Sequence, residues 1–353
     1  MEFLVDSGLK TKPGLAIQSG TVPFAVQAAV EAERSALPSF YSSEFYDRSA
    51  VVTLAAVAAA TTRIRIGTAI AWALGRTPVT VATEFRSLAE LAPGRVRLGL
   101  GTGSPQVIAD WHGLRETRPA ARLAELVPLI RQIWEIGSAA VEHDGEFYRC
   151  HLPVDPTLQP WPEVADPVTA DPRPRILLAG GRLPMIRAAG AVADGLVGLP
   201  LCSPAFVEDM IRPTLADAVR KAGRERPLPI TGMTICAVGE NSAQARAFAA
   251  MQLAVFAARP SAGPVMAFHG FQAEVAEIRG AFQRRDLPAV VAAVSDRMLD
   301  LLAVYGTPEE AYQRFSATFD GVYDEPLLFT AGKGMPEGGF RDSVLAVCEA
   351  FGH

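Results

Sequence analysis

The sequence predicts an α/β protein of the (β/α)8 TIM-barrel class, and three observations support this prediction. Apolar, strand-like segments alternate with amphipathic, helix-like segments along most of the 353 residues. The segment from Arg63 to Pro105 has the pattern of a βαβ unit that ends in a glycine-rich loop. About eight such strands occur over a length that is typical of one barrel.

The βαβ unit shows both periodicities. Arg63–Ile70 alternates polar and apolar residues and then becomes apolar, as expected of a strand that enters a buried parallel sheet. Thr77–Leu91 has apolar residues every three to four positions, and Pro78 suits the first turn of a helix. Arg95–Gly101 is then the second strand of the unit.

The same patterns predict the remaining elements in order. The predicted strands are Glu2–Leu9, Leu37–Ser42, Arg175–Ala179, Asp194–Leu199, Leu228–Val238 and Glu325–Phe329. The predicted helices are Thr21–Ala36, Ser49–Thr62, Arg118–Ile136, Arg182–Val192, Pro204–Ala222, Ser242–Ala257 and Gly339–Phe351. Lys10–Gly20 is predicted as a loop.

We expect residues 1–353 to form a single barrel domain with two insertions. Residues 140–174 are predicted as a hairpin that turns at Asp144-Gly145, followed by a loop rich in proline and aspartate. Residues 258–305 are predicted as a helical insertion before the last strand. A doubly wound sheet is the rival fold, but it favours a glycine-rich turn after the first strand, where this chain has Ser7-Gly8 alone.

Composition narrows the class of protein. A net charge of −5 argues against a nucleic-acid partner. The four cysteines lie far apart, which predicts reduced thiols in a cytoplasmic protein. We expect no signal peptide, no membrane span and no metal site, because no apolar run is long enough and no ligand spacing matches.

Two glycine-rich loops follow predicted strands and are the candidate ligand-binding segments. Gly101, Thr102, Gly103 and Ser104 form the loop at the end of one strand and are candidate binding residues, although glycine after a strand is most often simple turn geometry. Gly180 and Gly181 lead directly into a helix N-terminus, which favours a phosphate, and Arg182 adds positive charge.

No acid–base pair is obvious, so we expect a bound cofactor to supply the chemistry. His112 follows the first glycine loop, and its two interpretations are a surface histidine, which is the more common case, and an active-site donor.

Three segments resemble the luciferase-like family of flavin- and deazaflavin-dependent oxidoreductases, which have a (β/α)8 fold. They are IGTAIAW with GRTPVTVATEFRSLAELAPGRVRLGLGTG, then RPRILLAGGRLPMIRAAGAVADGL, and MLDLLAVYGTPEEAYQRF. The resemblance is to the branch that uses the deazaflavin coenzyme F420, particularly through the segments FHGF and MLD…YGTPEE.

The resemblance implies positions for the cofactor. It implies a non-prolyl cis peptide at Ala69–Ile70 under the flavin ring and a position near that ring for Gly101, Thr102 and Gly103. It also implies that Gly180, Gly181 and Arg182 receive the cofactor phosphate. Lys10, Lys12 and Arg76 are candidates to meet an acidic cofactor tail, although exposed basic residues are usually just solvated.

The chain departs from the branch at two positions. Many deazaflavin members have a histidine after the second strand, where this chain has Tyr46 and Asp47. Either residue, or His112, is a candidate proton donor; Asp47 is equally a candidate helix cap. Sugar-phosphate dehydrogenase members have an acid where this chain has Ser104, which argues against sugar-phosphate oxidation.

The resemblance leaves three functions open. The first is hydride transfer between coenzyme F420 and a small organic substrate. The alternative is an FMN-dependent monooxygenase, and the second alternative is a binding homologue without turnover. A homodimer is expected from the resemblance alone.

Overall fold

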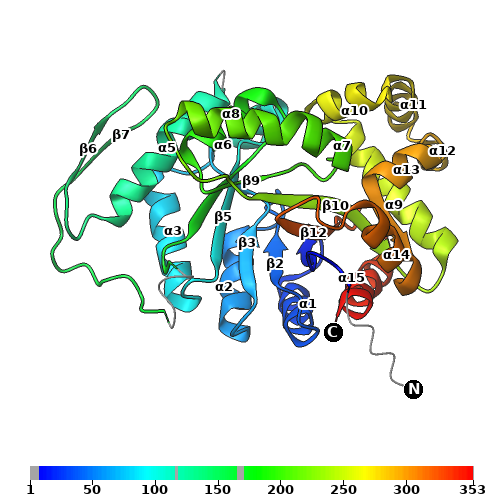
Figure 1. The fold of residues 1–353 in the computed structure, drawn as a ribbon, viewed down its shortest axis with the longest axis horizontal. Helices are drawn as coiled ribbons and strands as arrows, with labels where there is room; N and C mark the ends of the chain where they lie inside the picture. Colours follow the sequence, from blue (N-terminus) through cyan, green and yellow to red (C-terminus); the bar gives the residue numbers. More distant parts are fainter. Residues whose placement is uncertain (1–7, 116–117, 165–170, 353) are drawn as a thin grey trace.

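The computed structural model describes residues 8–115, 118–164 and 171–352, and its centre is a closed barrel of eight parallel strands (Figure 1). The strands pair around the ring in the order β1-β2-β3-β5-β8-β9-β10-β12, and β12 pairs with β1 to close it. This confirms the predicted fold class. The ring strands are β1 (Gly14–Ile17), β2 (Ser39–Ser42), β3 (Arg65–Thr68), β5 (Val96–Gly101), β8 (Arg175–Ala179), β9 (Gly195–Val197), β10 (Ile230–Val238) and β12 (Glu325–Thr330).

Two short strands extend the ring. β4 (Ala71–Trp72) follows β3 and pairs with the end of β5. β11 (Ala303–Gly306) pairs with the last residues of β10. β10 is long: its first residues pair with β9 and its middle residues pair with β12.

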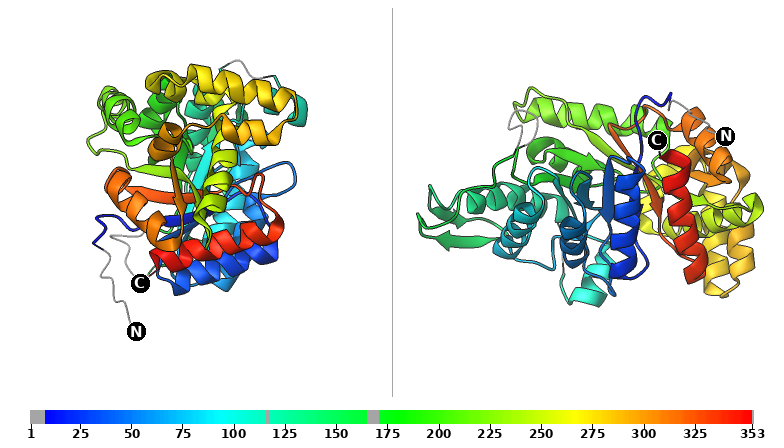
Figure 2. Two further views of the ribbon diagram at one scale, coloured as in Figure 1. Left: turned by 90° about the vertical axis from the view of Figure 1, so that its right-hand side faces the viewer. Right: turned by 90° about the horizontal axis from the view of Figure 1, so that it is seen from below.

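Helices surround the ring in the alternation that the sequence predicts. The larger helices that alternate with the strands are α1 (Val22–Arg34), α2 (Ala50–Ala60), α3 (Pro78–Leu91), α5 (Pro119–Trp134), α6 (Leu183–Val192), α8 (Arg212–Lys221), α9 (Ser242–Ala257), α14 (Pro308–Thr318) and α15 (Glu337–Phe351). Figure 2 shows α1 and α15 side by side, so the two ends of the barrel sequence pack together.

Serine and threonine caps explain where several helices begin. Thr21, Ser49 and Thr77 each accept a hydrogen bond from the backbone N–H three residues later. Pro78, at the first position of α3, has no N–H to leave unpaired there. The sequence signal for these helices is therefore local.

The remaining helical segments lie between the ring elements. They are α4 (Pro105–His112), α7 (Pro204–Phe206), a π-helical turn (Val207–Ile211) that continues into α8, a 3₁₀ turn (Pro260–Ala262), α10 (Gly263–His269), α11 (Gln272–Gln283), α12 (Leu287–Ala292) and α13 (Asp296–Leu302). The segment from α10 to α13 forms a helical layer at one end of the molecule (Figure 1).

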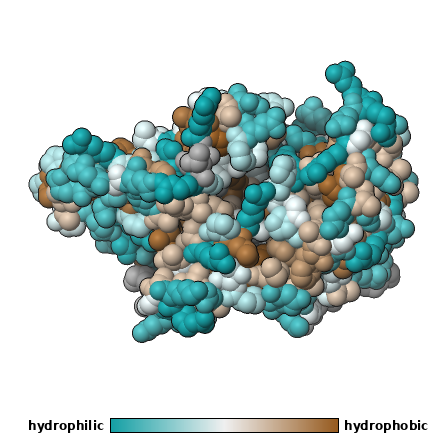
Figure 3. All heavy atoms as spheres, turned by 90° about the horizontal axis from the view of Figure 1, so that it is seen from above, coloured by the Kyte–Doolittle hydropathy of each residue, from teal (hydrophilic) through white to brown (hydrophobic). Residues whose placement is uncertain are grey.

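An antiparallel hairpin projects from the opposite end (Figure 1). It consists of β6 (Val141–Asp144) and β7 (Arg149–Leu152), as the turn signal at Asp144-Gly145 predicts. Figure 3 shows that this end of the molecule is largely hydrophilic, whereas apolar residues gather nearer the middle of that face.

The core lies inside the ring and between the ring and the helices. Each ring strand contributes residues with no exposed surface, such as Leu15, Phe40, Ile66, Leu98, Ile176, Leu196, Ile235 and Leu328. Among the described residues, no helix combines the length and the apolar character that a membrane crossing requires.

Two predicted boundaries are wrong. Residues 2–7 of the predicted first strand lie outside the described residues, and the first described strand, β1, lies within the predicted loop Lys10–Gly20. The second error concerns β11, which lies within the predicted helical insertion. Leu302 ends α13 and β11 begins at the next residue, so no turn residue marks the start of the strand. Short strands without flanking turn signals escape periodicity arguments.

Candidate active site

The carboxyl ends of the ring strands meet at one end of the barrel, which we call the mouth, and the strands begin at the other end, the floor. Strand register places Ile17, Ser42, Thr68 and Thr330 at one level near the mouth. The segments that follow these residues therefore surround one opening, which is where barrels of this class carry their functional residues.

The Ala69–Ile70 peptide bond at the mouth is cis, which confirms the expectation drawn from the resemblance. Ser43 Oγ donates to Ala69 O at 2.5 Å. The side chain of Ile70 lies against Gly101, because a Cβ atom at Gly101 would be 2.5 Å from Ile70 Cδ1. The structure thus brings the predicted residues Ala69, Ile70 and Gly101 together, and it explains why residue 101 is glycine.

The rest of the first glycine loop leads into α4, a helix that the sequence analysis did not predict. Gly103 has a φ of +70°, which favours glycine. The hydroxyl of Thr102 donates to Gly103 O at 3.2 Å. Ser104 caps α4 by accepting a hydrogen bond from Val107 N at 3.2 Å. Ser104 therefore has a structural partner at the position where sugar-phosphate dehydrogenases have an acid.

Four aromatic side chains from the β2–α2 loop, β4 and α4 form a cluster that we call the aromatic wall: Phe45, Tyr46, Trp72 and Trp111. The ring centroid of Trp111 lies 5.1 Å from those of Phe45 and Trp72 and 5.2 Å from that of Tyr46. Trp111 is 40% exposed and Tyr46 is 70% exposed. The wall presents apolar area to a ligand, and sequence reasoning missed Trp72 and Trp111 because their positions in the chain give no sign of contact.

The three candidate proton donors lie on or beside this wall. The Tyr46 ring packs on Phe45 at 4.4 Å between centroids. The Asp47 side chain is 55% exposed, and its carboxylate lies 3.9 Å from Arg48. His112 packs edge-on against Trp72 at 5.0 Å, and its Nε2 atom is buried with no hydrogen-bond partner among the described residues. Asp47 does not cap α2, because Ser49 does.

A buried ion pair fixes the loops that carry the wall. Arg76 donates from both terminal nitrogens to Glu44, at 2.6 and 2.7 Å, and from Nε to Glu84 at 2.9 Å. Glu44 also accepts from Trp72 N at 2.8 Å. Each of the three guanidinium nitrogens of Arg76 already has a carboxylate partner, so this geometry does not favour the predicted contact between Arg76 and an acidic cofactor tail.

The second glycine loop ends at the N-terminus of α6. Gly180 and Gly181 allow close packing, because Cβ atoms there would lie 2.5 Å from Met185 Cβ and from Leu199 Cδ1 respectively. The side chain of Arg182, the N-cap residue, makes no hydrogen bond to the helix backbone. It is exposed, and its Nη2 donates to Pro260 O at 2.9 Å. The predicted geometry, a glycine turn that opens into a helix N-terminus, is present.

Two further cations lie at the mouth that sequence reasoning did not single out. Lys333 follows β12, and its Nζ lies 4.4 Å from the centre of the Phe45 ring. Burial lowers the pKa of Lys333, the nearby Arg259 lowers it further, and Asp47 opposes both. Burial also lowers the pKa of Arg259. Partly buried cations near one opening favour an anionic ligand.

Lys10 and Lys12 do not lie at the mouth. They precede β1 and are therefore at the floor, where Lys10 N donates to the carboxylate of Asp320 at 3.0 Å. Their predicted contact with a cofactor tail is wrong for a cofactor at the mouth. Among the described residues, no group of three histidine, cysteine, aspartate or glutamate side chains could hold a metal ion.

The helical insertion is tied to the barrel through His269. Its Nε2 atom is 2.6 Å from the Oγ of Ser203, a buried residue in the loop between β9 and α7. Burial lowers the pKa of His269, and Arg297 lowers it further. Because Ser203 Oγ accepts from Phe206 N at 3.1 Å, its own proton is available to a neutral imidazole.

A family model described as luciferase-like monooxygenase matches residues 2–325 of the chain. The chain belongs to the luciferase-like monooxygenase family. It is therefore a luciferase-like oxidoreductase, as the resemblance implied.

Curated relatives show both long and partial matches. An uncharacterised protein of Mycobacterium tuberculosis is 28% identical over 309 residues, which cover 86% of this chain and 88% of that protein. An F420-dependent glucose-6-phosphate dehydrogenase of Kineococcus radiotolerans is 34% identical over 205 residues, which cover 55% of this chain and 56% of that one.

Solved structures share the fold over nearly the whole chain. The coenzyme F420-dependent tetrahydromethanopterin reductase of Methanopyrus kandleri aligns with a TM-score of 0.76 at 16% identity, covering 97% of this chain and 100% of that one. A type II Baeyer–Villiger monooxygenase of Pseudomonas putida in complex with FMN aligns with a TM-score of 0.65 at 16% identity, covering 97% and 98%. Proteins similar to this chain thus include users of either cofactor.

Proposed function

We propose that this protein is an F420-dependent oxidoreductase that transfers hydride to or from a small organic substrate at the mouth of the barrel. The observation that carries the choice of cofactor is the group of F420-dependent relatives. Five of these similar proteins, named as F420-dependent, are 31–35% identical to this chain over 121 to 205 residues. The support for FMN comes from a solved structure that is 16% identical to this chain, a level of identity that shows a shared fold alone.

The residues at the mouth fit such a cofactor. Coenzyme F420 combines a planar deazaflavin ring with a phosphate and an acidic tail. Ile70 and Gly101 leave a flat apolar seat at neighbouring strand ends, and the α6 N-terminus offers backbone N–H groups to a phosphate. The buried Oε1 atom of Gln18, directly after β1, has no partner among the described residues and suits a ring N–H donor.

Three cations at the mouth are our candidates for the contacts with the anionic part of the cofactor. Arg182 hydrogen-bonds the carbonyl of Pro260, the residue after Arg259, and Arg259 lies close enough to Lys333 to lower its pKa. In our proposal these three side chains bind the anionic part of the cofactor. Charge-assisted hydrogen bonds of this kind contribute about 1.5–3 kcal/mol each.

A bound deazaflavin would supply hydride-transfer chemistry, and the protein would supply orientation, a dry surface and a proton. The aromatic wall excludes water from one side of the mouth, and the Glu44–Arg76 ion pair holds the wall in place. We favour His112 over Tyr46 and Asp47 as the proton donor, because its buried Nε2 has no competing partner. Ser104 supports a substrate other than a sugar phosphate.

The first test is the identity of the bound cofactor. Protein purified from a host that makes F420 is denatured, and the released cofactor is identified by mass and fluorescence. We expect F420 and micromolar binding when purified F420 is titrated into cofactor-free protein. FMN in its place, with no affinity for F420, would show that the monooxygenase alternative is correct. No binding of either cofactor would favour the homologue without turnover.

The second test concerns the phosphate position. Arg182→Ala should weaken F420 binding roughly 10- to 100-fold, because one charge-assisted contact is lost. Arg187→Ala is the matched control, since Arg187 is an exposed arginine farther along the same helix. A charge change at Gly181 is less clean, because any side chain there would press on Leu199. Equal affinity of both variants would remove the phosphate assignment.

By the resemblance, we also propose that the enzyme acts as a cytoplasmic homodimer. Light scattering on the eluting protein tests the dimer: twice the chain mass of 37.6 kDa is expected, and a single-chain mass contradicts it.

A further inference from the structure

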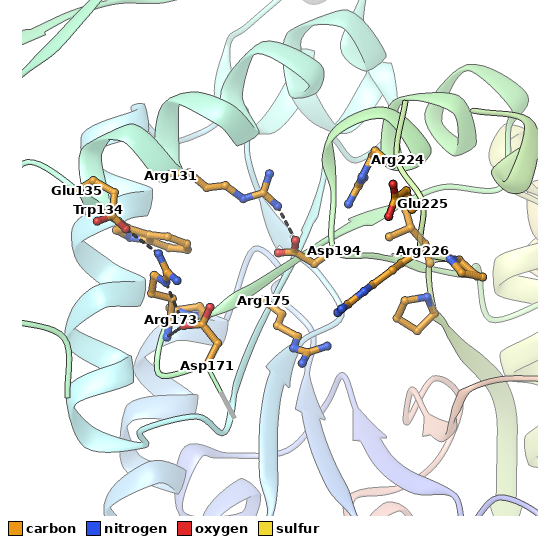
Figure 4. A pocket seen from close by; sticks show the side chains of 14 residues that line it. Arg131, Trp134, Glu135, Asp171, Arg173, Arg175, Asp194, Arg224, Glu225 and Arg226 are labelled. Atoms are coloured by element: carbon orange, nitrogen blue, oxygen red, sulfur yellow. Dashed lines mark hydrogen bonds and ion pairs between the residues drawn. The ribbon is translucent and has the colours of Figure 1, made fainter. Parts of the chain in front are cut away.

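A cavity of about 840 Å³ opens at the floor, at the opposite end of the barrel from the mouth (Figure 4). Its walls come from the end of α5, the segment that enters β8, the residue before β9 and the loop between α8 and β10. We call it the floor pocket. Among its described lining residues are five arginines and four carboxylates, in a chain whose net charge is −5. The pocket is thus locally positive.

One side of the floor pocket is neutralised by internal ion pairs. Arg131 Nη2 lies 2.6 Å from Asp194 Oδ1. Arg173 contacts Glu135 at 2.8 Å and Asp171 at 3.0 Å. These pairs, drawn as dashed lines in Figure 4, use three of the four carboxylates.

The other three arginines of the floor pocket have no such partner. Arg175, Arg224 and Arg226 form no ion pair with any described carboxylate. Arg224 Nη1 donates to the carbonyl of Gly190 at 3.0 Å. Burial lowers the pKa of the Arg224 guanidinium and the charge of Arg131 lowers it further, while the charge of Asp194 opposes both effects. Figure 4 shows Arg226 reaching from the α8–β10 loop towards the middle of the pocket, while Arg175 projects from the start of β8.

The position of Arg175 adds a repulsive contact. Arg175 on β8 lies directly opposite Arg97 on β5 in the parallel register. Burial lowers the pKa of the Arg97 guanidinium, and the charge of Arg175 lowers it further, although Tyr41 and Glu325 oppose these effects. Like charges placed opposite each other are destabilising, and a bound anion would offset that repulsion.

The all-arginine donor set indicates which anion would fit. The unpaired guanidinium groups come from two elements and present several N–H donors in planar forks, which match phosphate oxygens well. A single carboxylate offers only two acceptor oxygens to three arginine side chains. A terminal phosphoryl group offers three. The volume lies within the range of about 300–1,000 Å³ that is common for small-molecule sites.

We propose that the floor pocket is a second ligand site, separate from the mouth, and that it binds a phosphorylated small molecule through Arg175, Arg224 and Arg226. Such a ligand would bridge the start of β8 and the α8–β10 loop, two segments of the barrel floor. It would therefore stabilise the folded chain by an amount that grows with the logarithm of its free concentration once that exceeds Kd. The inference does not depend on which cofactor the mouth binds.

The experiment is a calorimetric titration of the full-length protein with inorganic pyrophosphate at low salt. We expect saturable binding that weakens at least 10-fold in Arg226→Ala and in Arg175→Ala. Arg220→Ala is the matched control, because Arg220 lies on α8 outside the pocket and pairs with Asp217. It should bind like the wild type. Circular dichroism of each variant establishes that it is folded.

Four outcomes would overturn the proposal. The first is no saturable binding to the wild type. The second is equal weakening in Arg220→Ala, which would indicate a general charge effect. The third is loss of binding in Arg182→Ala with retention in Arg226→Ala, which would place the anion at the mouth. The fourth is tighter binding of citrate than of pyrophosphate, which would make the ligand a carboxylate.

If Arg175→Ala fails to fold, the variants of the exposed Arg226 decide the test. Arg226→Lys keeps the positive charge but loses the planar fork of N–H donors, so it should show intermediate weakening.

Discussion

The floor and the mouth of this barrel are held together by different interactions. At the floor, carboxylates accept hydrogen bonds from the backbone N–H groups where strands begin: Glu33 from Ile64 at 2.8 Å, Asp194 from Ile176 at 2.8 Å and Asp324 from Ile230 at 2.9 Å. At the mouth, exposed aromatic rings contact one another, and the N-cap side chain of α6 does not cap the helix.

This difference separates stability from binding. A backbone donor that is already paired contributes to folding but is not available to a ligand. The donors at the α6 N-terminus and the partly buried cations of the mouth have the opposite property, so we expect changes at the floor to alter stability and changes at the mouth to alter affinity. The predictions below test this separation, from the largest expected effect to the smallest.

Glu44 is the exception at the mouth, and its loss should have the largest effect. Glu44→Ala leaves Arg76 buried with Glu84 as its single carboxylate partner and removes the acceptor of Trp72 N. Breaking a buried pair in this way costs about 3–5 kcal/mol of unfolding free energy. Denaturant titration measures it. Glu31→Ala, which removes an exposed pair with Arg34, should change stability by less than about 0.5 kcal/mol. Similar losses of unfolding free energy in the two variants would mean that the buried Glu44–Arg76 pair stabilises the fold no more than an exposed pair does.

Gly101→Ala should affect both properties. The new Cβ would meet Ile70 Cδ1 at 2.5 Å, so the flexible end of Ile70 must move into the mouth. We expect a loss of about 1–2 kcal/mol in stability, at the low end for overpacking, and at least 10-fold weaker F420 binding. Gly338→Ala is the control, because nothing lies within 4 Å of that Cβ. Unchanged F420 affinity in Gly101→Ala would contradict the seat formed by Ile70 and Gly101.

Glu33→Gln should reduce stability without changing cofactor affinity. Burial raises the pKa of Glu33, but hydrogen bonds from the N–H groups of Ile64, Arg63 and Thr62 together lower it more. A lowered folded-state pKa stabilises the protein above the ordinary value of about 4.5, and this stabilisation disappears as the pH falls through the lowered value. At pH 7 the variant should lose about 1 kcal/mol, since the site is partly exposed.

The pH profile checks this sign. Wild-type stability should fall more steeply than that of Glu33→Gln as the pH drops below about 4.5, so the two curves converge in acid. Curves that stay parallel would show that the Glu33 carboxylate does not hold the α2–β3 loop through its charge.

Trp111→Ala should have the smallest effect on stability. The ring is 40% exposed, and its contacts are three aromatic neighbours at the mouth. We therefore expect Trp111→Ala to lower the unfolding free energy by about 0.5 kcal/mol or slightly more, summed over the aromatic contacts. A loss above about 2 kcal/mol in a thermal or denaturant melt would mean that the wall is part of the core rather than a ligand surface.

Much of the fold could be predicted from the sequence because its signals are local. Thr77-Pro78 starts α3 where the cap and proline pattern indicates, and Arg175–Ala179 is a buried strand with the predicted bounds. β1 was missed because its four residues follow the loop-like pattern Lys12-Pro13, and β11 was missed because its four residues continue directly from α13 without a turn residue. The fold class survived both errors, since it depends on the alternation of elements.

The site was predictable only where neighbouring strands determine it. Ala69, Ile70 and Gly101 could be found because they end adjacent strands of the ring. The role of Arg76 could not, because its partner Glu44 is 32 residues away in the chain. Lys333 and Trp111 likewise reach the mouth from distant segments of the chain, and nothing in the sequence near them indicates their contacts.

The most direct test of the separation between mouth and floor is hydrogen exchange of the backbone N–H groups with and without F420. We predict slower exchange on F420 binding in residues 46–47, 102–104 and 181–183, and no change at Ile64, Ile176 and Ile230, whose N–H groups are already bonded to carboxylates. Slower exchange at those three floor positions, or none at the mouth while F420 is bound, would contradict the account.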